Sequence, residues 1–278
     1  MLALTRRVTF NAGHVYRGGG LAVEELHRLF GAAAEPSGHG HDYVLEVTVA
    51  GEPDPFHGMV VNIKTLDAVL DALVAPLDHR LLNDTVLEFR DAVPTTERLA
   101  LALWSRLPHE VEGARPIALR LQEHPGLYVE LFAQEQAMVH LTRSIEFAAA
   151  HRLHSENLSA AENQRLYGKC NNPHGHGHNY VVEVTLQGEP DARTGIVADL
   201  GKFDALLKTE VEERLDHKHL NLDTPYFKDR VPTGENIARV IWDLLETKVA
   251  ACREGGQVKL QRVRLIETAR SWFDYLGR

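Results

Sequence analysis

Apolar and polar side chains alternate in two short segments near the start of the chain, and the same pattern returns in the second half. Residues 8–14 and 43–49 alternate in this way, and residues 145–151 and 180–186 repeat the alternation. A period of two is typical of a strand with one face buried. The pattern therefore predicts two strands at the start of each half.

Helical spacing follows each predicted strand pair. Apolar side chains recur three and four positions apart over residues 66–74 and 200–211, which predicts one amphipathic helix in each half. Pro94-Thr95 and Pro232-Thr233 are start signals for second helices that run through Trp104 and Trp242. Each half is expected to close with a hairpin, at residues 117–123 with 127–132 and at residues 258–267 with 272–276. The order ββααββ, twice, predicts an α+β fold with antiparallel sheets.

The two halves are also related in sequence. The segment Gly38-His39-Gly40-His41-Asp42-Tyr43 returns as Gly175-His176-Gly177-His178-Asn179-Tyr180, 137 positions later, and His14 and His151 are separated by the same 137 positions. Two further pairs are 138 positions apart: Asp78-His79 with Asp216-His217, and Thr95-Thr96-Glu97 with Thr233-Gly234-Glu235. Four motifs in the same order indicate a duplication. We expect two domains, residues 1–139 and 140–278.

Composition narrows the class of protein. The chain has 278 residues, 44% of them hydrophobic and 25% charged, which is typical of a globular protein with room for two domains. A formal net charge of −9 argues against a nucleic-acid partner. No apolar run approaches the length of a membrane helix and the start has no signal-peptide pattern, so we expect no membrane association and a cytoplasmic location. Two cysteines are too few for a disulfide framework.

The histidines form the strongest chemical pattern. His176 and His178 are two residues apart, so on a strand both imidazoles lie on one face, and His151 ends the preceding predicted strand. Three imidazoles with a fourth position open are typical of catalytic zinc. An isolated His-x-His pair is more often a surface or structural feature. The duplication of the whole set as His14, His39 and His41 favours the metal interpretation in both halves.

Other candidates flank this site. Cys170 lies on a polar loop six residues before His176, where a metal can lower a thiol pKa, although a free cysteine is more often a buried apolar side chain. Cys252 fits that second role. Asp216-His217 and Asp78-His79 follow the first helix of each half and are either tuned histidines or surface pairs. Glu235 is a cap or first-turn acid, and Glu267 ends an apolar strand, where a carboxylate needs a partner.

Taken together, these motifs closely resemble 6-pyruvoyl-tetrahydropterin synthase. The resemblance rests on Phe147-x3-His151, Leu166-Tyr-Gly-Lys-Cys170-Asn-Asn-Pro-His-Gly-His176-Gly-His178-Asn-Tyr180, Leu215-Asp216-His217, Pro232-Thr-Gly-Glu235-Asn236 and Glu267-Thr268. It covers nearly all of residues 140–278, and the N-terminal half shares the frame more loosely. The family implies two tandem T-folds whose sheets assemble into barrels, with active sites at subunit interfaces.

The resemblance also implies a reaction and roles. The substrate is 7,8-dihydroneopterin triphosphate, which loses triphosphate to give 6-pyruvoyl-tetrahydropterin. By resemblance, His151, His176 and His178 hold Zn²⁺, Cys170 is the proton-abstracting base, and Asp216-His217 relays protons. Glu267 anchors the pterin ring, and Glu235 is assigned with it to substrate binding. No redox cofactor is expected.

Two alternatives remain open at this point. 6-Carboxytetrahydropterin synthase of the queuosine pathway uses the same substrate, but its cysteine is typically separated from the HGH by three residues, whereas five separate Cys170 from His176, which favours the pyruvoyl enzyme. A non-catalytic pterin- or metal-binding protein is the second alternative, and Cys170 argues against it.

The N-terminal half departs from the family at one position. Ala33 stands where the family has its cysteine, while His14, His39, His41 and the counterpart of the pterin anchor, Glu123, remain. We expect this half to hold metal without catalysing the reaction. Because one chain carries two T-folds, a pseudo-hexamer needs three chains, and we expect a homotrimer. Asp216-His217, rather than Asp78-His79, is the pair expected to face Cys170.

Overall fold

The computed structural model describes residues 1–135, 137–255 and 257–277. The chain divides into two compact units. Unit 1 comprises residues 1–142, 187–201 and 255–257, and unit 2 comprises residues 143–186, 202–254 and 258–278. The sequence repeats and the compact units therefore do not coincide, because residues 187–201 of the second repeat pack within unit 1.

Unit 1 is built on an antiparallel sheet. Strands β1 (Leu2–His14), β2 (His39–Gly51), β4 (Arg115–His124) and β5 (Leu127–Phe132) lie in the order β5-β4-β2-β1, and the two-residue β3 (Arg80–Leu81) adds a short parallel pairing to β1. The register places His14 opposite His39 and Ala12 opposite His41. The three histidines of the first repeat thus meet at one end of the β1–β2 pair.

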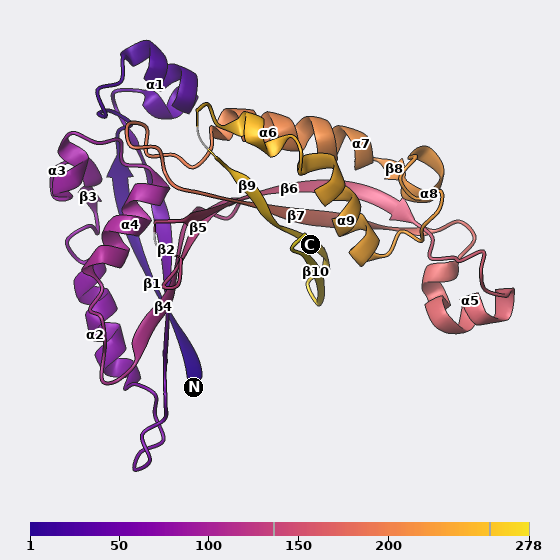
Figure 1. Ribbon diagram of the computed structural model, residues 1–278, viewed down its shortest axis with the longest axis horizontal. Coiled ribbons are helices and arrows are strands. Elements are labelled where there is room, and N and C mark those ends of the chain that lie inside the picture. Colours follow the sequence, from indigo (N-terminus) through magenta and orange to yellow (C-terminus); the bar gives the residue numbers. More distant parts are fainter. Residues whose placement is uncertain (136, 256, 278) are drawn as a thin grey trace. The chain divides into compact units, whose positions relative to one another are not determined.

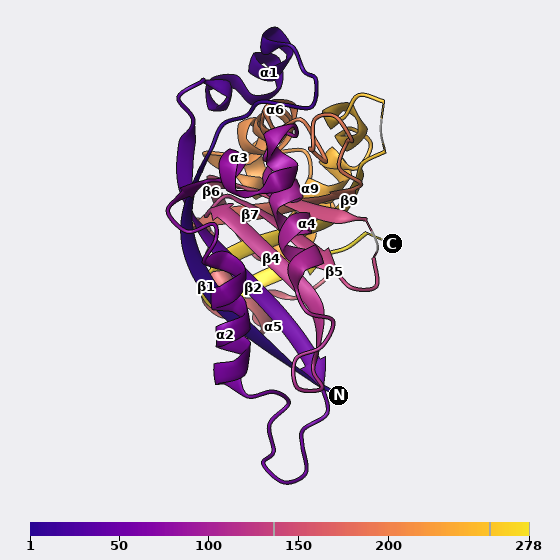
Figure 2. The same cartoon turned by 90° about the vertical axis from the view of Figure 1, so that its left-hand side faces the viewer.

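Helices cover one face of this sheet. They are α2 (Ile63–Val74) and α4 (Thr96–Arg106), with α3 (Leu82–Thr85) and a 3-10 turn at Leu87–Arg90 between them (Figure 2). Leu45, Val47 and Val49 project from alternate positions of β2 and are fully buried, as the period of two predicts. Thr95 caps α4, since its hydroxyl accepts a hydrogen bond from the Arg98 amide, which confirms the predicted helix start.

Unit 2 repeats the plan. Strands β6 (Val139–His151), β7 (His176–Gly188), β9 (Lys259–Thr268) and β10 (Ser271–Tyr275) lie in the order β10-β9-β7-β6, and the two-residue β8 (Lys218–His219) pairs with β6. Helix α9 (Gly234–Leu245), capped by Thr233, packs on β9 and β10. The remaining elements are α6 (Leu200–Leu207), a π-helical turn (Lys208–Glu212), α7 (Glu213–Leu215), α8 (Leu220–Asp223) and a 3-10 turn (Val249–Cys252). The α+β class and the antiparallel repeats are confirmed.

The sequence pattern missed the helix between the first two strands of each repeat, as well as the four-residue helices α3 and α8. Helices α1 (Val23–Phe30) and α5 (Ala160–Tyr167) lie between the first two strands, and each leads into a 3-10 turn, Gly31–Ala34 or Gly168–Asn171 (Figure 1). Both helices have eight residues, too few for helical periodicity to show clearly. The second of these turns carries Cys170. No helix within the described residues is long and apolar enough to span a bilayer.

Candidate metal and active site

Three imidazoles converge in unit 2. Each offers a ring nitrogen within 4.8 Å of those of the other two, and the side chains are His151, His176 and His178. The Nε2 atoms of His151 and His176 are 3.1 Å apart, and within the described residues the buried Nε2 of His178 has no hydrogen-bond partner. A cation between these nitrogens would satisfy both features, so the geometry fits a three-histidine metal centre.

The backbone fixes the direction of the central ligand. His151 Nδ1 lies 2.8 Å from the Pro232 carbonyl oxygen, which only accepts, so Nδ1 carries the proton and Nε2 presents its lone pair to the other imidazoles. Burial is the main cause that lowers the pKa of His151 to about 4; the Pro232 hydrogen bond opposes the shift, and His176 and His178 add to it. The pKa of His176 is also lowered, mainly by burial. Burial therefore favours the neutral, metal-binding form of His151 and His176.

Unit 1 contains the matching triad. His14, His39 and His41 also lie within 4.8 Å of one another, and the Nε2 atoms of His14 and His39 are 2.9 Å apart. His14 Nδ1 lies 3.1 Å from the Pro94 carbonyl, the counterpart of Pro232. Burial lowers the pKa of His14 to about 3, and His39 and His41 add to the effect. Both triads have the chemistry and geometry of metal sites.

A carboxylate stands beside each triad. Glu267 Oε1 lies 3.8 Å from Nε2 of both His151 and His178, and Glu123 Oε1 lies 3.4 Å from His41 Nε2. Thr96 donates a short hydrogen bond to Glu123. In the second repeat glycine, Gly234, replaces that threonine. The two carboxylates that the sequence predicted as pterin anchors thus reach their metal triads, and Glu267 accepts no equivalent bond from position 234.

The Asp-His pairs are held at a strained turn. Asp216 Oδ1 accepts a hydrogen bond from the Ala148 amide at 2.8 Å and its Oδ2 lies 2.7 Å from His217 Nδ1, and these bonds lower the Asp216 pKa. His217 has φ of 54°, its amide donates to the Ala148 carbonyl, and its side chain is 83% exposed. A left-handed backbone at a histidine is uncommon and is often found at functional sites.

His217 shares a pocket with a metal ligand. An open pocket of about 550 Å³ is lined by His178, His217, His219 and Asn179 together with residues of β6. An exposed histidine oriented by a carboxylate and facing this pocket is placed to exchange protons with a ligand there. The Asp78–His79 pair of unit 1 repeats the arrangement, with His79 at φ of 56° and its Nδ1 3.0 Å from Asp78 Oδ2.

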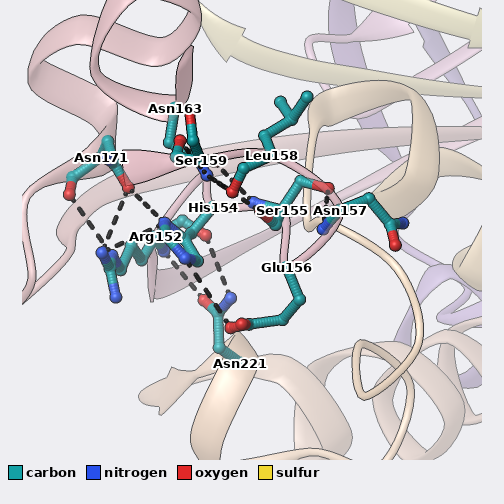
Figure 3. A network of polar contacts seen from close by, with 10 residues as sticks. All are labelled: Arg152, His154, Ser155, Glu156, Asn157, Leu158, Ser159, Asn163, Asn171 and Asn221. Atoms are coloured by element: carbon teal, nitrogen blue, oxygen red, sulfur yellow. Dashed lines mark hydrogen bonds and ion pairs between the residues drawn. The ribbon is translucent and has the colours of Figure 1, made fainter. Parts of the chain in front are cut away.

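A polar network fixes the loop that carries Cys170. Arg152 donates to the Asn171 carbonyl and side chain, and His154 Nδ1 lies 2.9 Å from Asn171 Oδ1 (Figure 3). The Leu153 amide donates to the Cys170 carbonyl at 2.9 Å. Cys170 is half-buried, and burial raises the pKa of the nearby Tyr180, whose hydroxyl lies 3.4 Å from His151 Nδ1. The cysteine is thus tied to the end of β6, where the triad begins.

The sequence analysis did not identify several residues that hold the ends of the triad strands in place. Asn83 and Asn221 each accept from and donate to the backbone of the residue that follows the first triad histidine, Val15 or Arg152. Their 138-residue separation was the available signal. Tyr16 was also missed: its ring centroid lies 4.6 Å from that of His14, and the side chain is buried in an apolar cluster with Leu26, Ala34 and Val93, against which Ala33 packs.

Glu235, predicted to bind substrate, lies exposed at the start of α9. Cys252, to which no role was assigned, is buried as expected. The roles of Cys170, Asp216, His217, Glu235 and Glu267 in catalysis or substrate binding stay predictions.

These features define a class: a duplicated α+β protein in which each repeat presents a three-histidine metal site beside a carboxylate. The model of the family 6-pyruvoyl tetrahydropterin synthase matches residues 3–134 and again residues 140–278, so the chain belongs to this family with two tandem domains.

Relatives agree. The chain is 42% identical over 143 residues to 6-pyruvoyl tetrahydrobiopterin synthase of Drosophila melanogaster, covering 51% of this chain and 82% of the relative. It is 51% identical over 106 residues to the Homo sapiens protein of the same name, covering 38% and 73%. A solved structure of Caenorhabditis elegans 6-pyruvoyl tetrahydropterin synthase is 40% identical and covers 51% of this chain and 96% of that one, with a TM-score of 0.47.

Proposed function

We propose that the protein is a zinc-dependent lyase that acts on 7,8-dihydroneopterin triphosphate, eliminating triphosphate to give 6-pyruvoyl-tetrahydropterin. The observation that carries the proposal is the meeting of a histidine triad, Glu267 and the fixed Cys170 loop in unit 2. Relatives 42% and 51% identical carry the matching name. The substrate and product are part of the proposal.

The residues suit the required proton transfers. His151, His176 and His178 would hold a zinc ion, whose Lewis acidity would make the hydroxyl-bearing carbons of the substrate side chain easier to deprotonate. The Cys170 thiolate accepts a proton from one such carbon as the bond to triphosphate breaks. His217, oriented by Asp216, exchanges protons at the other side of the side chain. The Glu267 carboxylate accepts hydrogen bonds from the pterin ring, which fixes the side chain against these groups.

A second pocket in unit 2 supports a triphosphate-bearing substrate. It has a volume of about 780 Å³, begins at His219 beside the triad and is lined by Arg152, Lys228 and Arg230. Glu156 and Asp229 also line it, so the pocket carries both signs of charge with cations in the majority. Arginine and lysine are the usual phosphate-binding side chains. We assign the triphosphate arm of the substrate to this pocket.

One assay tests the proposal. Purified protein loaded with zinc is incubated with 7,8-dihydroneopterin triphosphate, and the pterin product is identified by mass spectrometry. Formation of 6-pyruvoyl-tetrahydropterin with release of triphosphate is the expected result. A 6-carboxytetrahydropterin product would overturn the pyruvoyl assignment while keeping the substrate, and binding without turnover would overturn the enzyme assignment.

A further inference from the structure

His219 lines both pockets of unit 2. The pocket of about 550 Å³ also contains the metal ligand His178 and the exposed His217. The pocket of about 780 Å³ contains the cations Arg152, Lys228 and Arg230. The His219 side chain therefore stands at the junction between the metal site and the pocket to which we assign the triphosphate arm.

Strand β8 holds His219 in a fixed position. His219 pairs with Ala150 of β6, one residue before the ligand His151, and its amide donates to Asp223 Oδ2 at 2.7 Å. Two residues further on, Asn221 accepts from the Arg152 amide at 2.8 Å and donates to the Arg152 carbonyl at 3.0 Å (Figure 3). The backbone of β8 is thus tied to the end of β6 on both sides of the triad residue.

The imidazole of His219 reaches the edge of the metal site. A Cβ atom on Gly175, the residue before the ligand His176, would lie only 2.8 Å from His219 Nε2. Gly175 also has φ of 71°, a conformation that favours glycine. The ring therefore lies directly against the backbone that leads into the second triad strand.

Neither ring nitrogen of His219 is used by the fold. Nδ1 is buried and has no hydrogen-bond partner within the described residues, and Nε2 makes no hydrogen bond in that part of the chain either. A buried N–H without an acceptor is rarely tolerated, so the proton of the neutral ring resides on Nε2. His219 therefore offers one N–H donor that no protein group occupies.

The first repeat shows that the fold does not need an imidazole here. Leu81 is the counterpart of His219, and it pairs with Gly13 in the same parallel bridge to the first strand of its repeat. An apolar side chain at this position forms the same bridge. The repeat that lacks the cysteine, with Ala33 in its place, thus also lacks this histidine.

We propose that His219 is a further catalytic residue, whose Nε2–H donates a hydrogen bond to the ester oxygen that joins the substrate side chain to triphosphate. This inference rests on the proposed function and deepens it. With the hydroxyl-bearing carbons at the metal triad and the triphosphate in the cation-lined pocket, the bond that breaks spans the junction at which His219 stands.

The hydrogen bond acts on the leaving group. Cys170 accepts the proton from the neighbouring carbon, the electron pair of that C–H bond forms a C=C bond, and the C–O bond breaks with its electron pair remaining on the ester oxygen. Negative charge develops on this oxygen as triphosphate leaves. A donor aimed at it stabilises the transition state more than the bound substrate, and its contribution therefore appears in kcat. Nε2 keeps its proton throughout.

His219→Leu gives this position the side chain of the first repeat and tests the proposal. Its kcat is expected to fall by about 10²-fold, as for loss of one donor to a developing oxyanion, with KM changed by less than about twofold. His219→Gln keeps an N–H donor and should recover about tenfold of the loss. His174→Leu, at an exposed histidine outside both pockets, is the matched control and should keep wild-type kcat.

A second variant separates leaving-group stabilisation from substrate binding. Arg230→Ala removes a cation that contacts triphosphate equally before and during the reaction, so it should raise KM and leave kcat nearly unchanged. Zinc content and circular dichroism of every variant are measured alongside. An unchanged kcat in His219→Leu, no recovery in His219→Gln, or loss of zinc from His219→Leu each overturns the inference, the last because His219 would then only support the strand of His176.

Binding of inorganic tripolyphosphate tests His219 without turnover. The former ester oxygen is a charged terminal oxygen of free tripolyphosphate, so His219→Leu should weaken its calorimetric Kd by about tenfold in zinc-loaded protein. A wild type that binds tripolyphosphate in this His219-dependent way but releases no product would refute the proposed reaction and keep the donor assignment. Equal Kd values for the wild type and His219→Leu would overturn that assignment.

Discussion

The two histidine triads are nearly identical in geometry and differ in what surrounds them. Beside the first triad, the Tyr16 ring packs against His14, and burial, followed by the charge of Glu123, raises the pKa of the Tyr16 hydroxyl. Beside the second, Leu153 replaces Tyr16 in sequence, and its amide anchors the Cys170 loop. One triad is thus packed with an aromatic side chain, and the other is joined through Leu153 to the Cys170 loop and is bordered by two pockets.

The comparison teaches that a duplicated ligand set can be kept while the side chains around it differ. Metal ligands need only two strands in register and a carbonyl to orient one imidazole, and both repeats have these. A base must also be present in the space where substrate binds. In the first repeat Ala33 packs on an apolar cluster at the position where the second repeat has Cys170. We interpret the first site as structural metal binding and the second as catalytic.

The largest functional difference between the two repeats should come from Cys170, which the first repeat lacks. Cys170→Ala is expected to lower turnover by about 10⁴-fold, the upper range for loss of a general base, while zinc stays bound. Turnover is measured with 7,8-dihydroneopterin triphosphate and zinc by elemental analysis. Ala33→Cys is the matched control and should add no activity to that variant. Normal turnover in Cys170→Ala would refute the base assignment and move it to His217.

The next largest effect should come from removing one metal ligand from each triad in turn. Wild-type protein made with ample zinc is expected to hold two equivalents per chain, and His176→Ala or His39→Ala one each. Only His176→Ala should also abolish turnover, because it removes the ion beside Cys170. Less than one equivalent in the wild type would contradict both metal sites.

The buried carboxylate of Glu97 gives a prediction about the pH dependence of stability. Burial raises the pKa of Glu97 to about 7, from 4.5, against the hydrogen bond from Val197. The folded state therefore binds the Glu97 proton more tightly than the unfolded state, and this contribution is full below about pH 4.5 and is lost as pH rises through 7. Glu97→Gln should remove this loss, flattening the decline in unfolding free energy between pH 5 and pH 8 by about 3 kcal/mol.

The matched control for that experiment is the exposed carboxylate of Glu235, the counterpart of Glu97 in the second repeat. Glu235→Gln should leave the pH dependence unchanged because the Glu235 side chain is exposed at the start of α9. Urea unfolding at each pH gives the free energies. An equal flattening in both variants would show that burial of Glu97 is not the cause.

The Asp-His pairs should give the smallest difference. His217→Ala is expected to lower turnover by about 10²-fold, because His217 lines the pocket that contains His178, and His79→Ala should leave it nearly unchanged. Turnover of the two variants is compared side by side. A large loss only in His79→Ala would show that a pair from the first repeat faces the catalytic cysteine.

The sequence alone determined the strands, the duplication and both triads. These depend on local rules: alternation places residues two apart on one face of a strand, and Thr95 and Thr233 cap helices through their own next turn. The short helices α1 and α5 escaped because eight residues carry little periodicity. A candidate ligand set is predictable when its spacing is fixed by one strand pair.

Only the tertiary structure decided the surroundings of each site. Residues 187–201 belong to the second repeat in sequence but pack in unit 1, where the Val197 amide donates to the buried Glu97 carboxylate. This contact joins residues 100 positions apart, and no periodicity encodes it. The packing of Tyr16 with Leu26, Ala34 and Val93 likewise joins separate segments of the first repeat. The two glutamates at the helix starts are equivalent in sequence, and their burial differs because it depends on which segment packs over them.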